Sequence, residues 1–351
     1  MGSKAHIQYL DVLKGVIIFL VVVGHAFHFG FEYYRSTLLY VLRSIDMPIF
    51  LFLSGMLGAG ALSFTAEGIR GYWLKKARQL LLPLCTLPFL YALVYDIELR
   101  HLLLDRMHGG YWFTLTLFEM FALLYVVRAS NRLVNKGDNP WIEVGLAALS
   151  LAFVQLVDAP WERLHPSSWE ALSWGKMNYL YQYFLLGYFA GRYQALERLI
   201  SSTQAQAVAA IVFFACIYRE TTAQAVLGGI PASISGLIMA YATAKRLGNG
   251  TSRLNAFWAY LGRESRTIYL THYFLLFSLP AVGKYLKGIQ DDERIFLIEA
   301  LCASAYALVV IGATLLLVRM LRSNAYLDTL FYGKRLPQPA QPATPIPDQA
   351  A

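Results

Sequence analysis

Ten long apolar segments divide the chain of 351 residues, and they restrict its fold more than any other feature of the sequence. A helix needs about 20 apolar residues to cross the hydrocarbon core of a membrane, where every backbone polar group must be satisfied internally. Only 15% of the residues are charged, against about 25% in soluble proteins. The sequence therefore predicts an all-α integral membrane protein with about ten transmembrane helices, at about 9–30, 44–62, 79–96, 110–128, 142–158, 178–193, 205–218, 226–244, 256–280 and 295–321.

The distribution of basic residues predicts the orientation of these helices, because loops rich in Lys and Arg stay in the cytoplasm. With the N-terminus placed inside, the cytoplasmic side holds 20 of the 30 Lys and Arg residues, and most carboxylates fall on the other side. Both termini are therefore expected in the cytoplasm. The net charge of +8 is explained by contact with anionic membrane lipid, and no nucleic acid is expected as a partner.

The domain organisation is expected to be simple. Residues 1–335 are predicted to form a single polytopic domain. The remaining segment, LPQPAQPATPIPDQAA at 336–351, is too rich in Pro and Ala to bury a core, so we expect a disordered cytoplasmic tail. The three cysteines, Cys85, Cys216 and Cys302, have no paired spacing, so neither a disulfide framework nor a metal site is indicated.

The first apolar segment carries polar residues, and placing such residues in the hydrocarbon core of a membrane costs free energy unless they have partners. Lys14 and His25 are eleven residues apart, which places them on nearly the same face of a helix and roughly 16 Å apart along its axis. Asp11 lies three residues before Lys14 and can pair with it on that face. His25 lies past the middle of the segment, where an unpaired polar group would cost several kcal/mol unless it faced protein or water.

These polar residues also have structural explanations. Lys14 could extend its ammonium group to the lipid headgroups, and a histidine within a membrane can serve as a hydrogen bond between helices. His28 is expected near the outer interface of the membrane. Glu119, the other deeply placed carboxylate, could orient an imidazole or form a structural pair with Arg43 or Lys14.

Several segments together resemble a known family. YLDVLKGVIIFLVVVGHAF (9–27) resembles the first helix of the acyltransferase-3 superfamily of polytopic membrane acyltransferases, in which ten residues separate a basic residue from a histidine. Later segments resemble the same superfamily in the same order: DMPIFLFLSGMLGA (46–59), LKKARQLLLPL (74–84), GYWFTLTLF (110–118) and LGRESRTIYLTHYFLLF (261–277). The strings LDVLKG and MPIFLFLSG are similar to the fucose O-acetylase-like branch, which acts on bacterial glycans. Lys75 departs from the pattern, which has Arg there.

The resemblance implies a multi-pass enzyme of the bacterial cytoplasmic (inner) membrane. It would transfer an acyl group, usually acetyl, from acyl-CoA to a hydroxyl of a glycan or lipid-linked oligosaccharide, without a metal. Lys14, Lys75, Lys76 and Arg78 would bind the phosphates of acetyl-CoA by charge-assisted hydrogen bonds. His25 would act as the general base on the acceptor hydroxyl. Further residues expected to line the site are Asp11, Glu119, Tyr269, His272 and Trp112.

Two other functions remain open from the sequence. A transporter or flippase of a lipid-linked glycan could use buried His25 and Glu119 to relay protons or to bind substrate. The absence of an obvious inverted repeat and the clustering of cations near residues 74–78 favour the enzyme. The third alternative is a non-catalytic scaffold for polysaccharide assembly, in which substitution of His25 would leave the glycans of the cell unchanged.

Overall fold

The computed structural model describes residues 7–34, 36–135, 139–219, 226–289, 292–334 and 336. Over these residues the secondary structure is entirely helical. The elements are α1 (Gln8–His25), η1 (Ala26–Gly30), α2 (Thr37–Gly58), α3 (Ala66–Lys76), η2 (Ala77–Leu81), α4 (Leu82–Tyr95), α5 (Leu99–Leu104), η3 (His108–Gly110), α6 (Trp112–Asn135), α7 (Pro140–Leu164), α8 (Pro166–Ala171), α9 (Trp174–Arg192), α10 (Gln194–Ile200), α11 (Thr203–Arg219), α12 (Val226–Leu247), α13 (Arg253–Thr271), η4 (His272–Leu275), α14 (Pro280–Lys287), α15 (Asp292–Arg322) and α16 (Ala325–Tyr332). The predicted tail at 336–351 lies outside the described residues except for Leu336.

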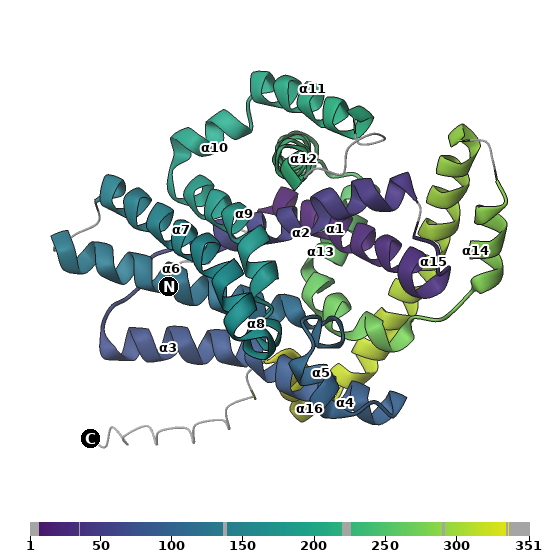
Figure 1. Ribbon diagram of the computed structural model, residues 1–351, viewed down its shortest axis with the longest axis horizontal. Helices are drawn as coiled ribbons and strands as arrows, with labels where there is room; N and C mark the ends of the chain where they lie inside the picture. Colours follow the sequence, from purple (N-terminus) through teal and green to yellow (C-terminus); the bar gives the residue numbers. More distant parts are fainter. Residues whose placement is uncertain are drawn as a thin grey trace, which may run out of the picture.

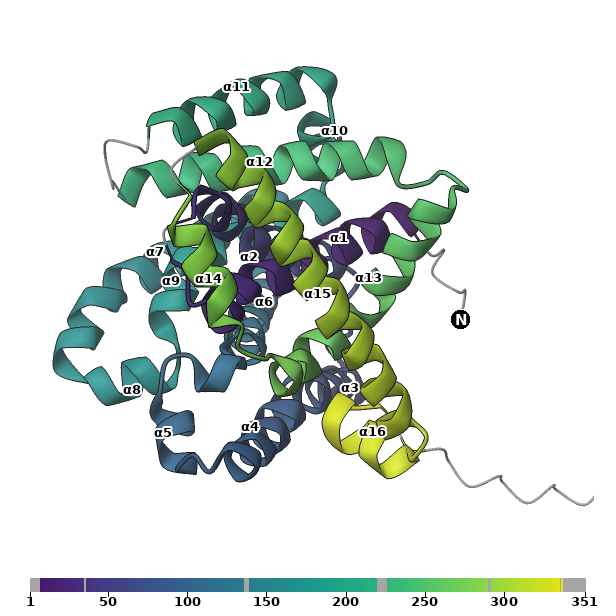
Figure 2. The ribbon, with the colours of Figure 1, turned by 90° about the vertical axis from the view of Figure 1, so that its right-hand side faces the viewer.

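The two N-terminal helices, α1 and α2, form the centre of the bundle, and the other helices surround them (Figure 1). Helix α1 packs against α13, and α2 packs against α9. Helices α11 and α12 pair along one edge, α6 and α7 pair along another, and α15 crosses the face that Figure 2 turns toward the viewer. The first helix is therefore enclosed by protein, which is what the polar residues of its sequence require.

Glycine allows α1 and α13 to approach closely. A Cβ atom added to Gly15 would collide with the backbone carbonyl of Trp258 on α13, and one added to Gly262 would collide with the carbonyl of Asp11 on α1. The helix backbones thus touch at two points, which is typical of membrane helices that pack through small residues. The same arrangement joins α2 and α9, where Gly55 lies against the carbonyl of Phe184.

Within the described part of the chain, six helical segments are long and apolar enough to cross a membrane. They are Gln8–Gly30, Thr37–Gly58, Ala66–Tyr95, Trp112–Val134, Pro140–Leu164 and Arg294–Arg322; the bent pair Gln194–Ile200 and Thr203–Ile217 makes a seventh if it forms one span. Helices α9, α12 and α13 have 19, 22 and 19 residues and stand outside this set. The prediction of an all-α multi-pass membrane protein is confirmed, whereas ten crossings and the orientation of the termini stay predictions.

Candidate active site

Two histidines meet where α1 and α13 end. Nδ1 of His25, the last residue of α1, lies 2.9 Å from Nε2 of His272, the first residue after α13. The two rings are nearly parallel, with 13° between their planes. His272 is fully buried, whereas His25, taken as a whole residue, is partly exposed. His25 is therefore the more exposed residue of the pair.

The chain around His272 is fixed by three tyrosines. Tyr269 donates a hydrogen bond from its hydroxyl to the carbonyl of Gly110 (2.6 Å), and Tyr111 donates to the carbonyl of Leu270 (3.1 Å). The hydroxyl of Tyr273 lies 3.3 Å from Nε2 of His25. Gly110 has a φ of +99°, and a Cβ there would collide with the ring of Tyr273. The turn before α6 is therefore built to receive the end of α13 closely.

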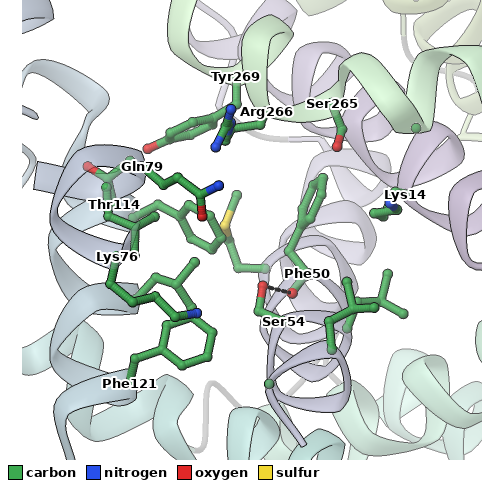
Figure 3. A pocket seen from close by; sticks show the side chains of 18 of the residues that line it. Lys14, Phe50, Ser54, Lys76, Gln79, Thr114, Phe121, Ser265, Arg266 and Tyr269 are labelled. Carbon is green, nitrogen blue, oxygen red and sulfur yellow. Dashed lines mark hydrogen bonds between the residues drawn. The ribbon is translucent and has the colours of Figure 1, made fainter. Parts of the chain in front are cut away.

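A cavity of about 390 Å³ lies beside this pair, between α1, α2, α6 and α13 (Figure 3). Tyr269, Phe113, Thr114 and Met47 contribute to its lining, and the ring centroid of Tyr269 is 6.2 Å from that of His272. Neither His25 nor His272 lines the cavity itself. Tyr269 therefore both lines the cavity and lies near His272.

Basic side chains from several elements line the same cavity. Lys14 approaches from α1, Lys75 and Lys76 from α3, and Arg263 and Arg266 from α13. Figure 3 shows Lys14 on one side of the cavity, Lys76 on the other, and Arg266 beside Tyr269 at the top of the view. Three of the four cations that the sequence assigned to the donor are thus brought together, although residues 14 and 76 are far apart in the chain.

Arg78 takes a different position from the one expected beside these lysines. Its Nε donates a hydrogen bond to the carbonyl of Gly333 (2.8 Å), just after α16, and it does not line the cavity. Arg266 does line the cavity, and it also donates to the carbonyl of Tyr332 (2.9 Å). Sequence reasoning counted Arg263 and Arg266 only as inside-positive residues. Arg263 and Arg266 lie six and three residues before Tyr269 on the same helix, and this position was the available signal.

The other predicted lining residues are dispersed. Asp11 forms an ion pair with Lys14, one helical turn away. Glu119 does not line the cavity, and among the described residues no hydrogen-bond partner reaches its Oε2. Trp112 is buried, and the ammonium of Lys176 lies 5.1 Å from the centre of one of its rings. Only Asp11 is therefore joined to the cation cluster, through Lys14.

Comparison with known proteins identifies the family. The acyltransferase domain family, Acyl_transf_3, matches residues 7–318, which is most of the chain. The nodulation protein NolL of Mesorhizobium japonicum is 32% identical over 172 residues, 44% of this chain and 43% of that protein, so the match spans less than half of this relative. No solved structure matches. The helices, the enclosed polar face of α1 and this match agree, and the chain belongs to the acyltransferase-3 family of membrane acyltransferases.

Proposed function

We propose that the protein is a membrane O-acetyltransferase that transfers an acetyl group from acetyl-CoA to a hydroxyl of a bacterial surface or exported glycan, with His25 as the general base. The observation that carries this proposal is the cavity, because it is lined by cations from α1, α3 and α13 and reaches Tyr269, the neighbour of the histidine pair. Such a cavity suits a donor that has an anionic head and a long, narrow arm ending in a thioester.

The cations would bind the phosphates of coenzyme A. Lys14, Lys76 and Arg266 present donors from different sides of the cavity, so several phosphate oxygens could be held by charge-assisted hydrogen bonds. Phe50, Phe113 and Leu117 line the same cavity, and these would contact the pantetheine arm. Ser54 faces the cavity as well, with its hydroxyl bonded to the carbonyl of Phe50.

His25 would then move a single proton. The acceptor hydroxyl gives its proton to Nε2 of His25 as its oxygen attacks the carbonyl carbon of the thioester. The bond between the acetyl carbon and sulfur breaks, and the departing thiolate takes the proton from the imidazolium. The oxygen–acetyl bond replaces the sulfur–acetyl bond, so the imidazole ends neutral, as it began.

The orientation of the protein is part of the proposal. We place the Lys14 end of α1 and both termini on the cytoplasmic side of a bacterial inner membrane, with ten crossings. The supply of acetyl-CoA in the cytoplasm and the surplus of basic residues support this side. The acceptor, a glycan or a lipid-linked oligosaccharide, would approach His25 where α1 ends.

Radiolabel transfer from acetyl-CoA by the purified protein tests the proposal. The protein in lipid nanodiscs is incubated with acetyl-labelled acetyl-CoA and the glycan fraction of cells that lack it, and His25→Ala serves as the control. We expect label in the glycan and a gain of one acetyl mass, both lost in the control. Glycan translocation without label transfer would instead identify a transporter or flippase, and equal labelling by the control would exclude His25 as the base.

A further inference from the structure

We infer that His272 is a positioning residue that holds His25 in the tautomer with a bare Nε2. This inference rests on the proposed function, in which Nε2 of His25 accepts the proton. It starts from the surroundings of His272, whose Nδ1 lies 2.9 Å from the carbonyl oxygens of both Ile268 and Tyr269. Carbonyl oxygens only accept hydrogen bonds, so Nδ1 of His272 must carry a hydrogen.

The end of α13 supplies these two carbonyls. Ile268 and Tyr269 lie in the last turn of α13, which ends at Thr271, and the backbone N–H of His272 already donates to the carbonyl of Ile268. The last carbonyl groups of a helix otherwise lack partners further along the same helix. The imidazole of His272 folds back over them. Its tautomer is therefore selected by backbone geometry rather than by another side chain.

The hydrogen on Nδ1 of His272 determines which nitrogen of His25 carries a hydrogen. A neutral imidazole carries one N–H group, so Nε2 of His272 has a lone pair and can only accept. Nδ1 of His25 is 2.9 Å from that atom and must be the donor. His25 then carries its single hydrogen on Nδ1, and its Nε2 is left with a lone pair directed toward the hydroxyl of Tyr273, 3.3 Å away.

The alternative arrangements are unfavourable. If His272 donated from Nε2, its bare Nδ1 would face two carbonyl oxygens inside a fully buried site, and no hydrogen would lie between these acceptors. A doubly protonated His272 would place a charge in the same site, and no carboxylate of the described residues is in hydrogen-bond contact with either ring. Burial of an unpaired charge is far more costly than burial of a neutral ring.

The hydrogen bond between the two histidines matters both before and after His25 accepts the proton. Before the transfer, His272 keeps the lone pair of His25 on Nε2, where the hydroxyl of Tyr273 now lies and where an acceptor hydroxyl would take its place. After His25 has taken the proton, the hydrogen on its Nδ1 still points at Nε2 of His272, which stabilises the imidazolium without accepting the proton itself. The same logic of an orienting partner applies to the acid of a Ser-His-Asp triad, although here the partner is neutral.

Kinetics distinguish positioning from simple packing. His272→Ala should lower kcat by about a hundredfold to ten-thousandfold, the usual contribution of general acid–base catalysis, while the KM for acetyl-CoA changes less than about threefold. Thr271→Val is the matched control, because this buried neighbour bonds the hydroxyl of Tyr332 instead of a histidine. Its kcat should stay near the wild-type value. A kcat for His272→Ala within twofold of wild type would overturn the inference.

A spectroscopic measurement can determine the tautomer of His25 without relying on acetyl transfer. Nitrogen-15 NMR of histidine-labelled wild-type protein in lipid, with the His25 signals assigned by their loss in His25→Gln, should show a protonated Nδ1 and a bare Nε2. A protonated Nε2 on a neutral His25 would refute the inference, even if His272→Ala were inactive through misfolding. Failure of the wild type to transfer acetyl would count against the proposed function, and the NMR result would still decide the tautomer.

Discussion

His28 and Arg43 lie within hydrogen-bond distance, with 3.4 Å between Nδ1 of the histidine and Nη2 of the guanidinium. His28, the second histidine of the first membrane segment, therefore contacts an arginine, whereas His25 pairs with His272. His28 is exposed and sits on η1, three residues beyond His25. The two histidines of this segment therefore differ in partner as well as in position.

We expect His25→Ala to abolish acetyl transfer while the protein remains folded in the membrane, because its imidazole is assigned to proton transfer. His28→Ala should reduce the rate much less, since its contact with Arg43 lies outside the pair. Acetylation of the glycan, measured by mass spectrometry at matched expression, checks both. Near-normal acetylation by His25→Ala would rule out the assignment.

Arg266→Ala should raise the KM for acetyl-CoA about tenfold to a hundredfold, because each lost charge-assisted hydrogen bond is worth about 1.5–3 kcal/mol. A contact with the nucleotide, remote from the thioester, contributes equally to the ground and transition states, so kcat should change little. Arg266→Lys should recover part of the loss, since a point charge cannot replace the planar guanidinium. Unchanged donor saturation in Arg266→Ala would show that this arginine does not bind the donor.

Arg78→Ala provides a separate test of the cation cluster. The family resemblance assigns Arg78 to the phosphates, whereas its Nε donates to the carbonyl of Gly333 and the residue does not line the cavity. We expect a smaller rise in the KM for acetyl-CoA than for Arg266→Ala, together with a lower midpoint of thermal unfolding, because α16 loses an attachment. An equal or larger KM effect at unchanged thermal stability would instead indicate a direct phosphate contact.

Gly15→Ala should destabilise the protein, because the added Cβ would collide with the carbonyl of Trp258 and force α1 away from α13. Overpacking of this kind costs typically about 1–3 kcal/mol, and here it would also separate His25 from His272. Gly312→Ala is the control, since nothing lies within 4 Å of a Cβ at that position. The fraction of protein that survives heating as a monodisperse species is the measurement. Equal survival of the two variants would contradict the close contact.

Reporter fusions test the orientation of the bundle. Helices α6 and α7 are joined near Asn139, and α7 ends before His165. A reporter inserted at Asn139 should behave as cytoplasmic and one at His165 as periplasmic, because α7 is long and apolar enough to cross the membrane between them. The same side for both fusions would mean that α7 does not span it.

The sequence predicts the local part of the site well. Lys14 and His25 share one helix, and the period of an α-helix is enough to place them on one face. Asp11 pairs with Lys14 for the same reason. Lys75 and Lys76 line the same cavity as Lys14, although only the family resemblance, and not helical periodicity, connected these segments.

The long-range part of the site could not be derived in this way. Residues 25 and 272 are separated by 247 positions, and periodicity within α1 does not reveal which helix will cover it. The packing of α13 on α1 depends on Gly15 and Gly262, where the two backbones touch. This role cannot be recognised before the two helices are placed together. Helices α9 and α13 are packed against protein, so they need not be as apolar as helices that face lipid, and counting apolar residues therefore identifies them less clearly.

The pairing of the first membrane helix with α13 also has a consequence for synthesis. The chain is made from its N-terminus, so α1 enters the membrane before the ribosome has reached the codon for His272. At 5–20 residues per second, 247 residues take roughly 12–50 s. During that interval the imidazole of His25 has neither His272 nor Tyr273 beside it, so both contacts form only after the end of α13 has been made.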